Sequence, residues 1–148
     1  MKGCGATNNK GPSGISVGSG SVVTDCAATS NTSSAAASAG IRTDSGRTVI
    51  DCTSSSNTSS VVATPTTGMG FDLGGGSMIR GCVAYRNKGD GIRIADNGTA
   101  RDNQCTSNGN YEGGVGTGAG IYAAGSDIRI EANNVTDNDR GGPLPLAI

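Results

Sequence analysis

The stretch Gly91–Asn108, GIRIADNGTARDNQCTSN, contains the pattern that decides the fold of this chain. It opens with a glycine and two isoleucines separated by a polar residue, and it ends at an asparagine 17 positions after the glycine. The same offset of 17 recurs in the segments that start at Gly14, Gly40 and Gly70, and the segment that starts at Gly120 reaches its asparagine in 18. A fixed offset in successive segments indicates an internal repeat.

Aligned on this asparagine, the repeats show columns of similar residues. The asparagine column holds Asn9, Asn31, Asn57, Asn87, Asn108 and Asn138. The column five positions earlier holds Cys4, Cys26, Cys52, Cys82, Asn103 and Asn133. The column three positions earlier holds Ala6, Ala28, Ser54, Ala84, Cys105 and Val135. The column eight positions earlier holds Val23, Val49, Ile79, Ala100 and Ile130.

These columns predict a solenoid. The apolar–polar alternation after each glycine is typical of a half-buried strand, and each repeat contains about three such strands separated by bends. No single repeat can bury its apolar side alone, so we expect the repeats to stack. A strand that pairs with its copy one coil later gives a parallel β-helix with coils about 4.8 Å apart. The asparagine column then becomes a ladder whose amides bond main-chain groups at a bend.

The repeat predicts one β-helix domain over residues 1–148. A partial coil covers residues 1–13, five coils begin near residues 14, 40, 70, 91 and 120, and a tail follows over residues 141–148. The ends of a solenoid normally need caps. Three alternatives follow: the chain is a fragment of a longer β-helix, its coil ends are covered by another copy in a homo-oligomer, or the tail folds across the last coil.

The composition fits this fold and excludes several classes of function. Gly, Ser, Thr and Asn make up nearly half of the 148 residues, which without the repeat would indicate disorder. The formal charge of −1 gives no basic field for a nucleic acid. The chain has no histidine, which removes histidine-based catalysis and metal ligation. No stretch approaches the roughly 18 apolar residues of a membrane span, and no signal peptide is visible.

The pattern Gly-Ile-x-Ile followed by Asn-x-Cys/Val-x-x-Asn resembles the right-handed parallel β-helix repeats of the pectate-lyase-like superfamily and of NosD-type proteins, most clearly over residues 118–141. The resemblance implies an all-β, right-handed parallel β-helix. It also implies a secreted, periplasmic or cell-surface location and a polysaccharide as the partner. The catalytic signatures of polygalacturonases and alginate epimerases are absent, so the resemblance favours binding over catalysis.

One outward column offers candidate site residues. Two positions after each repeat glycine it holds Ser16, Arg42, Asp72, Arg93 and Tyr122. In related polysaccharide lyases an outward aspartate binds Ca²⁺ and an arginine abstracts a proton from a uronate. The resemblance thus implies such roles for Arg42, Asp72 and Arg93, with Tyr122 as a ring that stacks on a sugar. The alternative is that opposite charges on neighbouring strands stabilise each other. A single aspartate also supplies few of the six to eight oxygen ligands that Ca²⁺ takes.

A second candidate is the pair Asp25 and Asp51. They lie six positions before Asn31 and Asn57, the asparagines of the column in consecutive repeats, which we call the anchor asparagines. Stacked coils predict about 5 Å between them, a separation that suits the two carboxylates of a retaining glycosidase. The alternative is that both aspartates form turns.

A third candidate is the rim made by the linkers from each anchor asparagine to the next repeat glycine. These linkers differ in length and are expected at one corner, and long insertions on one face of a solenoid often build its binding surface. The linker over residues 109–119 adds Tyr111 and Glu112 as candidate ligand-binding residues. The alternative is a set of Ser, Thr and Gly loops with no ligand.

Two further columns leave alternatives open. A rank of hydroxyl residues two positions before the anchor holds Thr7, Thr29, Ser55, Tyr85, Thr106 and Thr136. A flat threonine rank resembles an ice-binding solenoid, but threonine suits any exposed strand. The stacked cysteines are either small buried apolar residues or disulfides, Cys4–Cys26 or Cys52–Cys82.

The function that these observations favour is a carbohydrate-interacting β-helix module. The alternatives are a structural solenoid that stacks on other subunits, and an ice-binding solenoid.

Overall fold

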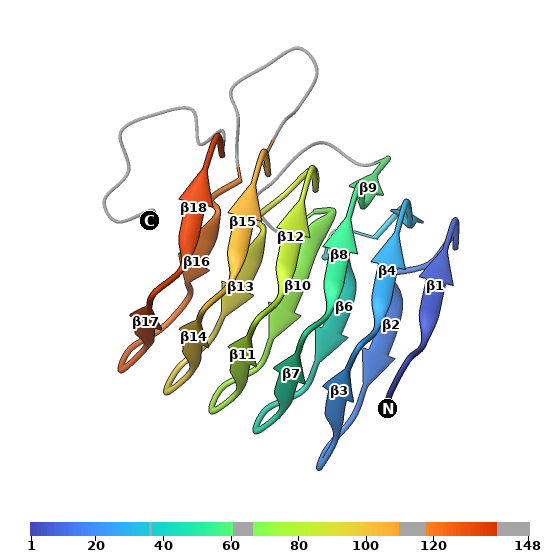
Figure 1. Ribbon diagram of the computed structural model, residues 1–148. Coiled ribbons are helices and arrows are strands. Elements are labelled where there is room, and N and C mark those ends of the chain that lie inside the picture. Colours follow the sequence, from blue (N-terminus) through green and yellow to red (C-terminus); the bar gives the residue numbers. More distant parts are fainter. Residues whose placement is uncertain (36, 61–66, 110–117, 139–148) are drawn as a thin grey trace.

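A computed structural model of the protein describes residues 1–35, 37–60, 67–109 and 118–138. Every regular element in these residues is a β-strand (Figure 1). The strands stack into three parallel sheets that run the length of the molecule.

Sheet 1 has six strands in the order β1 (Gly5–Thr7), β4 (Ala27–Thr29), β8 (Thr53–Ser55), β12 (Val83–Tyr85), β15 (Gln104–Thr106) and β18 (Asn134–Thr136). Sheet 2 has five, in the order β2 (Ser13–Val17), β6 (Ala39–Thr43), β10 (Met69–Leu73), β13 (Ile92–Ile94) and β16 (Ile121–Ala123). Sheet 3 has five, in the order β3 (Val22–Thr24), β7 (Thr48–Ile50), β11 (Met78–Arg80), β14 (Thr99–Arg101) and β17 (Arg129–Glu131).

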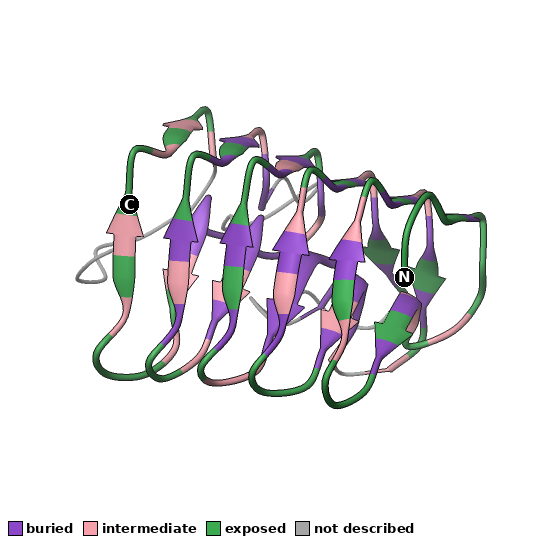
Figure 2. Ribbon diagram, turned by 60° about the horizontal axis from the view of Figure 1, so that its bottom comes forward, coloured by how far each residue is buried: buried purple, intermediate pink, exposed green. Residues whose placement is uncertain are grey.

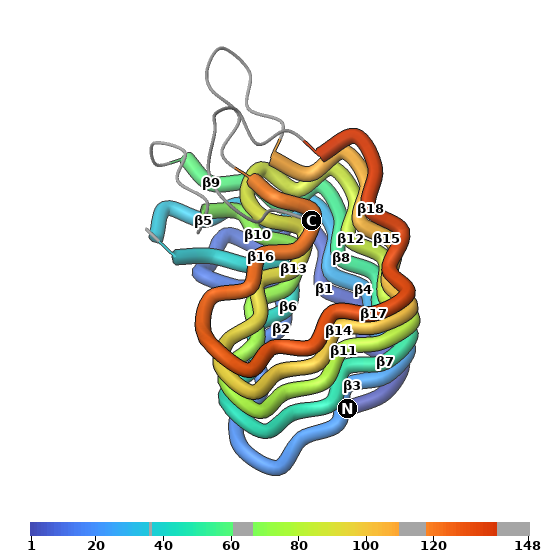
Figure 3. Tube along the Cα trace, turned by 90° about the vertical axis from the view of Figure 1, so that its left-hand side faces the viewer, coloured from blue at the N-terminus to red at the C-terminus, as the bar shows by residue number. Residues whose placement is uncertain are grey.

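Each strand pairs in parallel with its copy in the next coil, so the chain winds as a solenoid whose coils overlie one another (Figure 3). The predicted columns are in register: Ile79 of sheet 3 lies between Val49 and Ala100. The prediction of a parallel solenoid with three strands per coil is confirmed. A short fourth sheet, β5 (Thr32–Ser33) with β9 (Thr58–Ser59), was not predicted.

The core is the narrow space between the three sheets. Figure 2 shows buried residues recurring at the same position from strand to strand. The buried set is small or aliphatic apart from Phe71, and its fully covered members include Val23, Ala28, Val49, Ile79, Ala84, Ile92, Ile94, Ala100 and Cys105. Because strands only about 10 Å apart face one another across this space, the interior has little room for aromatic rings.

The bends between sheets use left-handed backbone conformations. Between sheet 3 and sheet 1 the positive-φ residues are Gly3, Asp25, Asp51, Gly81, Asp102 and Ala132, with φ between 51° and 64°. Just before the anchor asparagines they are Asn8, Ser30, Ser56, Arg86, Ser107 and Asp137, with φ between 52° and 56°. Left-handed backbone favours Gly, Asn and Asp, which explains why short polar residues recur at the bends.

One position of the core holds a polar residue between apolar neighbours. Thr43 is only 5% exposed and lies between Val17 and Leu73 in the inward rank of sheet 2. Its Oγ1 has no hydrogen-bond partner in the described part of the chain. A buried hydroxyl without a partner costs about 1–3 kcal/mol.

We therefore expect the isosteric substitution Thr43→Val to raise the free energy of unfolding by about 1 kcal/mol, because it removes that hydroxyl without changing the volume. Urea denaturation followed by circular dichroism would measure the change. Thr48→Val on the outer side of sheet 3 is the control and should have little effect. A destabilised Thr43→Val variant would show that the hydroxyl is satisfied.

Candidate functional site

The corner between sheet 1 and sheet 2 is fixed by the asparagine column, which positions every linker of the rim. In each of the five steps, Nδ2 of one asparagine donates to Oδ1 of the next at 2.9–3.0 Å. The same Oδ1 accepts the backbone N–H of the preceding asparagine at 3.0–3.2 Å. From Asn31 onward, Nδ2 also donates to a sheet 1 carbonyl at 2.8–3.2 Å. The predicted asparagine ladder is confirmed.

The offset of 17 has a steric cause at this corner. A β-carbon placed on Gly91 would lie 2.7 Å from Nδ2 of Asn108, and one on Gly70 would lie 2.7 Å from Nδ2 of Asn87. The glycine leaves the space that the ladder amide fills. Each coil therefore needs a glycine opposite its own asparagine.

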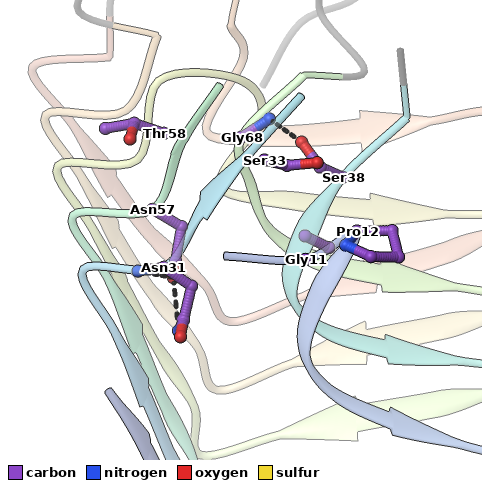
Figure 4. Close-up of a pocket in the computed structure, with 9 residues that line it drawn as sticks. Gly11, Pro12, Asn31, Ser33, Ser38, Asn57, Thr58 and Gly68 are labelled. Carbon is purple, nitrogen blue, oxygen red and sulfur yellow. Dashed lines mark hydrogen bonds between the residues drawn. The ribbon is translucent and has the colours of Figure 1, made fainter. Parts of the chain in front are cut away.

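The rim at this corner carries two hollows beside the β5–β9 ledge. The described parts of the linkers gather on this side of the solenoid (Figure 3). One is a tight crevice lined by Gly11, Pro12, Asn31, Ser33, Ser38, Ala39, Asn57, Thr58 and Gly68 (Figure 4). Ser38 and Gly68 on its lining are joined by a hydrogen bond, in which Oγ of Ser38 accepts the Gly68 N–H at 2.8 Å.

The second hollow is lined by Lys10, Thr32, Ser33, Ser34 and Ser60. All five residues lie in the linkers that were predicted to form the rim. Lys10 pairs with Thr32, and Thr32 pairs with Thr58, so one rank follows the asparagine column directly. In the sequence this rank is the position after each of the first four asparagines of the column, which holds Lys10, Thr32, Thr58 and Lys88.

The outward rank of sheet 2 brings three of the predicted site residues together. Asp72 lies in register with Arg42 on one side and with Arg93 on the other. Nη2 of Arg42 is 2.9 Å from Oδ2 of Asp72, and Nη1 of Arg93 is 3.0 Å from Oδ1. The carboxylate is 9% exposed, whereas the side chains of Arg42 and Arg93 are 37% and 31% exposed. This is the arrangement that the alternative of mutual charge stabilisation predicts.

The arginines also decide what Asp72 can bind. Both of its oxygens accept from a guanidinium group, and Arg42 adds a second bond from Nε at 3.1 Å. A divalent cation at this carboxylate would face two positive charges and would lack the six to eight oxygens of a Ca²⁺ site. The residues present do not fit the Ca²⁺ that the resemblance implied here.

The guanidinium group of Arg93 is not fully satisfied by the described residues. Its Nε is buried and has no partner among the described residues. Tyr122 follows it on the next strand, in register and half-buried. The rank thus ends in a fixed guanidinium group beside an aromatic ring.

The structure places Asp25 and Asp51 on consecutive coils, at the bend between sheet 3 and sheet 1. Both have a positive φ, and the carboxylate of Asp25 is 3.7 Å from Nζ of Lys2. A β-carbon on Gly81, the next residue of this column, would lie 2.3 Å from Oδ1 of Asp51. The turn-forming role accounts for both aspartates, and a catalytic role stays a prediction. Tyr111 and Glu112 lie outside the described residues.

The outer face of sheet 1 carries the hydroxyl rank. Thr29 and Ser55 are hydrogen-bonded at 3.3 Å, and Thr106 and Thr136 at 3.2 Å. Tyr85 stands between these pairs, 36% exposed, with the Arg86 guanidinium 4.9 Å from its ring centre. Ice binding by this face stays a prediction, and the tyrosine interrupts the surface that it would use.

The cysteine column forms a second ladder. The backbone N–H groups of Cys4, Cys26 and Cys52 each donate to Sγ of the next cysteine at 3.4 Å, and the N–H of Cys82 donates to Oδ1 of Asn103 at 3.0 Å. Sulfur therefore takes the accepting role that the asparagine oxygen has in later coils. All five cysteines are free thiols in the structure, and all except Cys4 are buried.

Burial and hydrogen bonding together set the acidity of these thiols. It raises the pKa of Cys26, and it raises the pKa of Cys105 to about 12. The hydrogen bond between Cys82 and Cys52, together with burial, raises the pKa of Cys82. These three groups are mainly protonated at neutral pH, and they react only through the small fraction that is thiolate.

In the parts of the chain that the structure describes, no group of three or more Cys, Asp or Glu side chains is placed to hold a metal ion. No described helix is long and apolar enough to cross a membrane.

Of three comparisons with known proteins, the one with family models gave a match. Searches of curated proteins and of solved structures returned no match. A family described as "Right handed beta helix region" matches residues 1–144, which is nearly the whole chain. The chain therefore belongs to the right-handed β-helix family.

Proposed function

We propose that this protein is a carbohydrate-binding β-helix module that recognises an acidic polysaccharide through the outward rank of sheet 2. The observation that carries the proposal is the ion-paired set Arg42–Asp72–Arg93, which ends beside Tyr122. The fold by itself supports only the coarser statement that the protein is a β-helix solenoid.

The aspartate orders the two arginines for binding. Because Asp72 is nearly covered and bonded on both oxygens, each guanidinium is held in one orientation without spending all of its donors. The three side chains together carry one net positive charge. Arginine presents a planar fork of donors that matches a carboxylate, so a uronate is the sugar class that fits this rank.

Tyr122 supplies the other part of a sugar site. A half-buried tyrosine offers an apolar ring and a polar hydroxyl at the same place. Parallel register keeps this ring one strand from Arg93, at the spacing of about 4.8 Å between neighbouring strands. One sugar ring can therefore contact the tyrosine while its carboxylate reaches the arginine.

The geometry favours binding over bond cleavage. A general base must be free to take a proton, and both oxygens of Asp72 are engaged by arginines. The chain has no histidine to replace it.

The test is calorimetry of the full chain with an oligomer of galacturonic acid. We expect Arg93→Ala to weaken binding by about tenfold or more, because it removes a charge-assisted hydrogen bond. Arg80→Ala on the outer face of sheet 3 is the matched control and should bind as the unchanged protein does. An uncharged glucose oligomer should bind more weakly than the acidic one.

Three results would overturn the proposal. The first is no binding of the acidic oligomer by the folded protein. The second is equal loss of affinity in Arg93→Ala and Arg80→Ala, which would indicate attraction by charge alone. The third is the appearance of new oligomer ends in the same mixtures, which would make the protein an enzyme.

A further inference from the structure

The cysteine ladder has one thiol that solvent can reach. Cys4 is exposed at the N-terminal end of the ladder, and its neighbour Cys26 is 2% exposed. Cys52 and Cys82 are each 1% exposed and Cys105 is fully buried. A small oxidant therefore reaches the folded protein's cysteines at one end only.

Cys4 and Cys26 are stacked in register. The residues that follow them, Gly5 and Ala27, are partners in the β1–β4 pair, and the Ala27 N–H donates to the Cys4 carbonyl at 2.8 Å. Neighbouring strands place their α-carbons about 4.8 Å apart, which lies within the range of about 4.4–6.8 Å that disulfides span. The Cys4 N–H already lies 3.4 Å from Sγ of Cys26.

We propose that Cys4 and Cys26 are a redox pair that closes to a disulfide by exchange with a small-molecule disulfide such as oxidised glutathione. The Cys4 thiolate attacks one sulfur of oxidised glutathione and releases one glutathione thiolate. Cys26 then loses its proton and attacks the Cys4 sulfur of the mixed disulfide, which releases the second glutathione. Two protein thiols are oxidised, and one oxidised glutathione is reduced to two glutathione molecules.

The crosslink would fasten the first coil to the second. It joins residues 22 apart, and it replaces the weak bonds that Cys26 makes to the Cys4 N–H and to the Thr24 carbonyl. Closing a loop of this length restricts the unfolded chain. The second step speeds up as the pH rises, because burial raises the pKa of Cys26.

The experiment treats the folded, reduced full chain with oxidised glutathione and quenches it in acid. Unreacted thiols are then alkylated in denaturant and counted by mass spectrometry. We expect three of the five thiols to remain, a mass lower by two hydrogens before alkylation, and a crosslinked peptide that joins Cys4 to Cys26. Dithiothreitol should restore all five.

Two variants make the assignment specific. Cys4→Ser changes an exposed residue, so it should fold normally and leave its four remaining thiols unreacted. Cys26→Ala should stop at a glutathione adduct on Cys4, whereas Cys105→Ala should close the disulfide as the unchanged protein does. The proposal is overturned if the unchanged protein keeps all five thiols, stays at the glutathione adduct, or crosslinks Cys52 or Cys82.

Discussion

Asn87→Ala is expected to lower the free energy of unfolding by about 4 kcal/mol, one of the two largest effects that we predict. The Asn87 side chain is 1% exposed and makes four ladder contacts. Its Oδ1 accepts from the backbone and side-chain nitrogens of Asn57 at 3.1 and 2.9 Å. Its Nδ2 donates to the Ser54 carbonyl at 2.8 Å and to Asn108 at 2.9 Å. Removing the amide leaves several buried polar groups without partners, each costing about 1–3 kcal/mol.

The same ladder provides a matched control. Asn9 is exposed at the N-terminal end of the described ladder and donates its side-chain bond to Asn31 at 3.0 Å. Asn9→Ala should therefore cost less than about 1 kcal/mol. Urea denaturation of both variants, followed by circular dichroism, measures the difference. Equal stability of the two variants would mean that the ladder does not hold the corner.

Gly91→Ala is the second large effect, with an expected loss of about 3 kcal/mol or more. The added β-carbon would lie 2.5 Å from the Gly120 carbonyl oxygen and 2.7 Å from Nδ2 of Asn108. One contact is backbone of the next coil and the other is a fixed ladder amide, so neither can move without breaking hydrogen bonds. Overpacking of this kind shifts the backbone and destabilises the fold.

Gly5→Ala is the control for this substitution. Gly5 lies in β1, and a β-carbon there would meet nothing within 4 Å. We expect a change of less than about 1 kcal/mol, because alanine also loses less conformational entropy than glycine on folding. Thermal unfolding of Gly91→Ala and Gly5→Ala in parallel compares the two sites. Similar midpoints would show that the space beside Asn108 adapts to a methyl group.

Much of the fold followed from the spacing of residues. The Gly91-to-Asn108 offset predicted the repeat because a steric relation between the two residues recurs in every coil. The inward columns were predicted correctly, since stacked parallel strands place equivalent residues one above another. The ledge of β5 and β9 was not predicted, although both strands lie in the same Asn-Thr-Ser-Ser sequence, because each strand is only two residues long and shows no apolar alternation.

The contacts within the candidate site were harder to predict from the sequence. Sequence placed Arg42, Asp72 and Arg93 in one column, but it left open whether the aspartate meets a cation or its neighbours. The structure shows both arginines on its two oxygens. That outcome depends on side-chain orientation between coils, which composition and spacing do not encode. Tyr122 stays a predicted sugar-binding residue, and coil-end oligomerisation stays a prediction.

By itself, the sequence determined that this protein is a repeating parallel β-solenoid, because period and column identity are properties of the chain alone. Only the tertiary structure decided which polar side chains join a ladder, which form ion pairs and which stay exposed. Within the described residues, it left Nε of Arg93 and the hydroxyl of Thr43 without a hydrogen-bond partner, and Cys4 with an exposed thiol. The physical reason is that hydrogen-bond partners and burial are set by neighbours 21–30 residues away, which meet only when the coils stack.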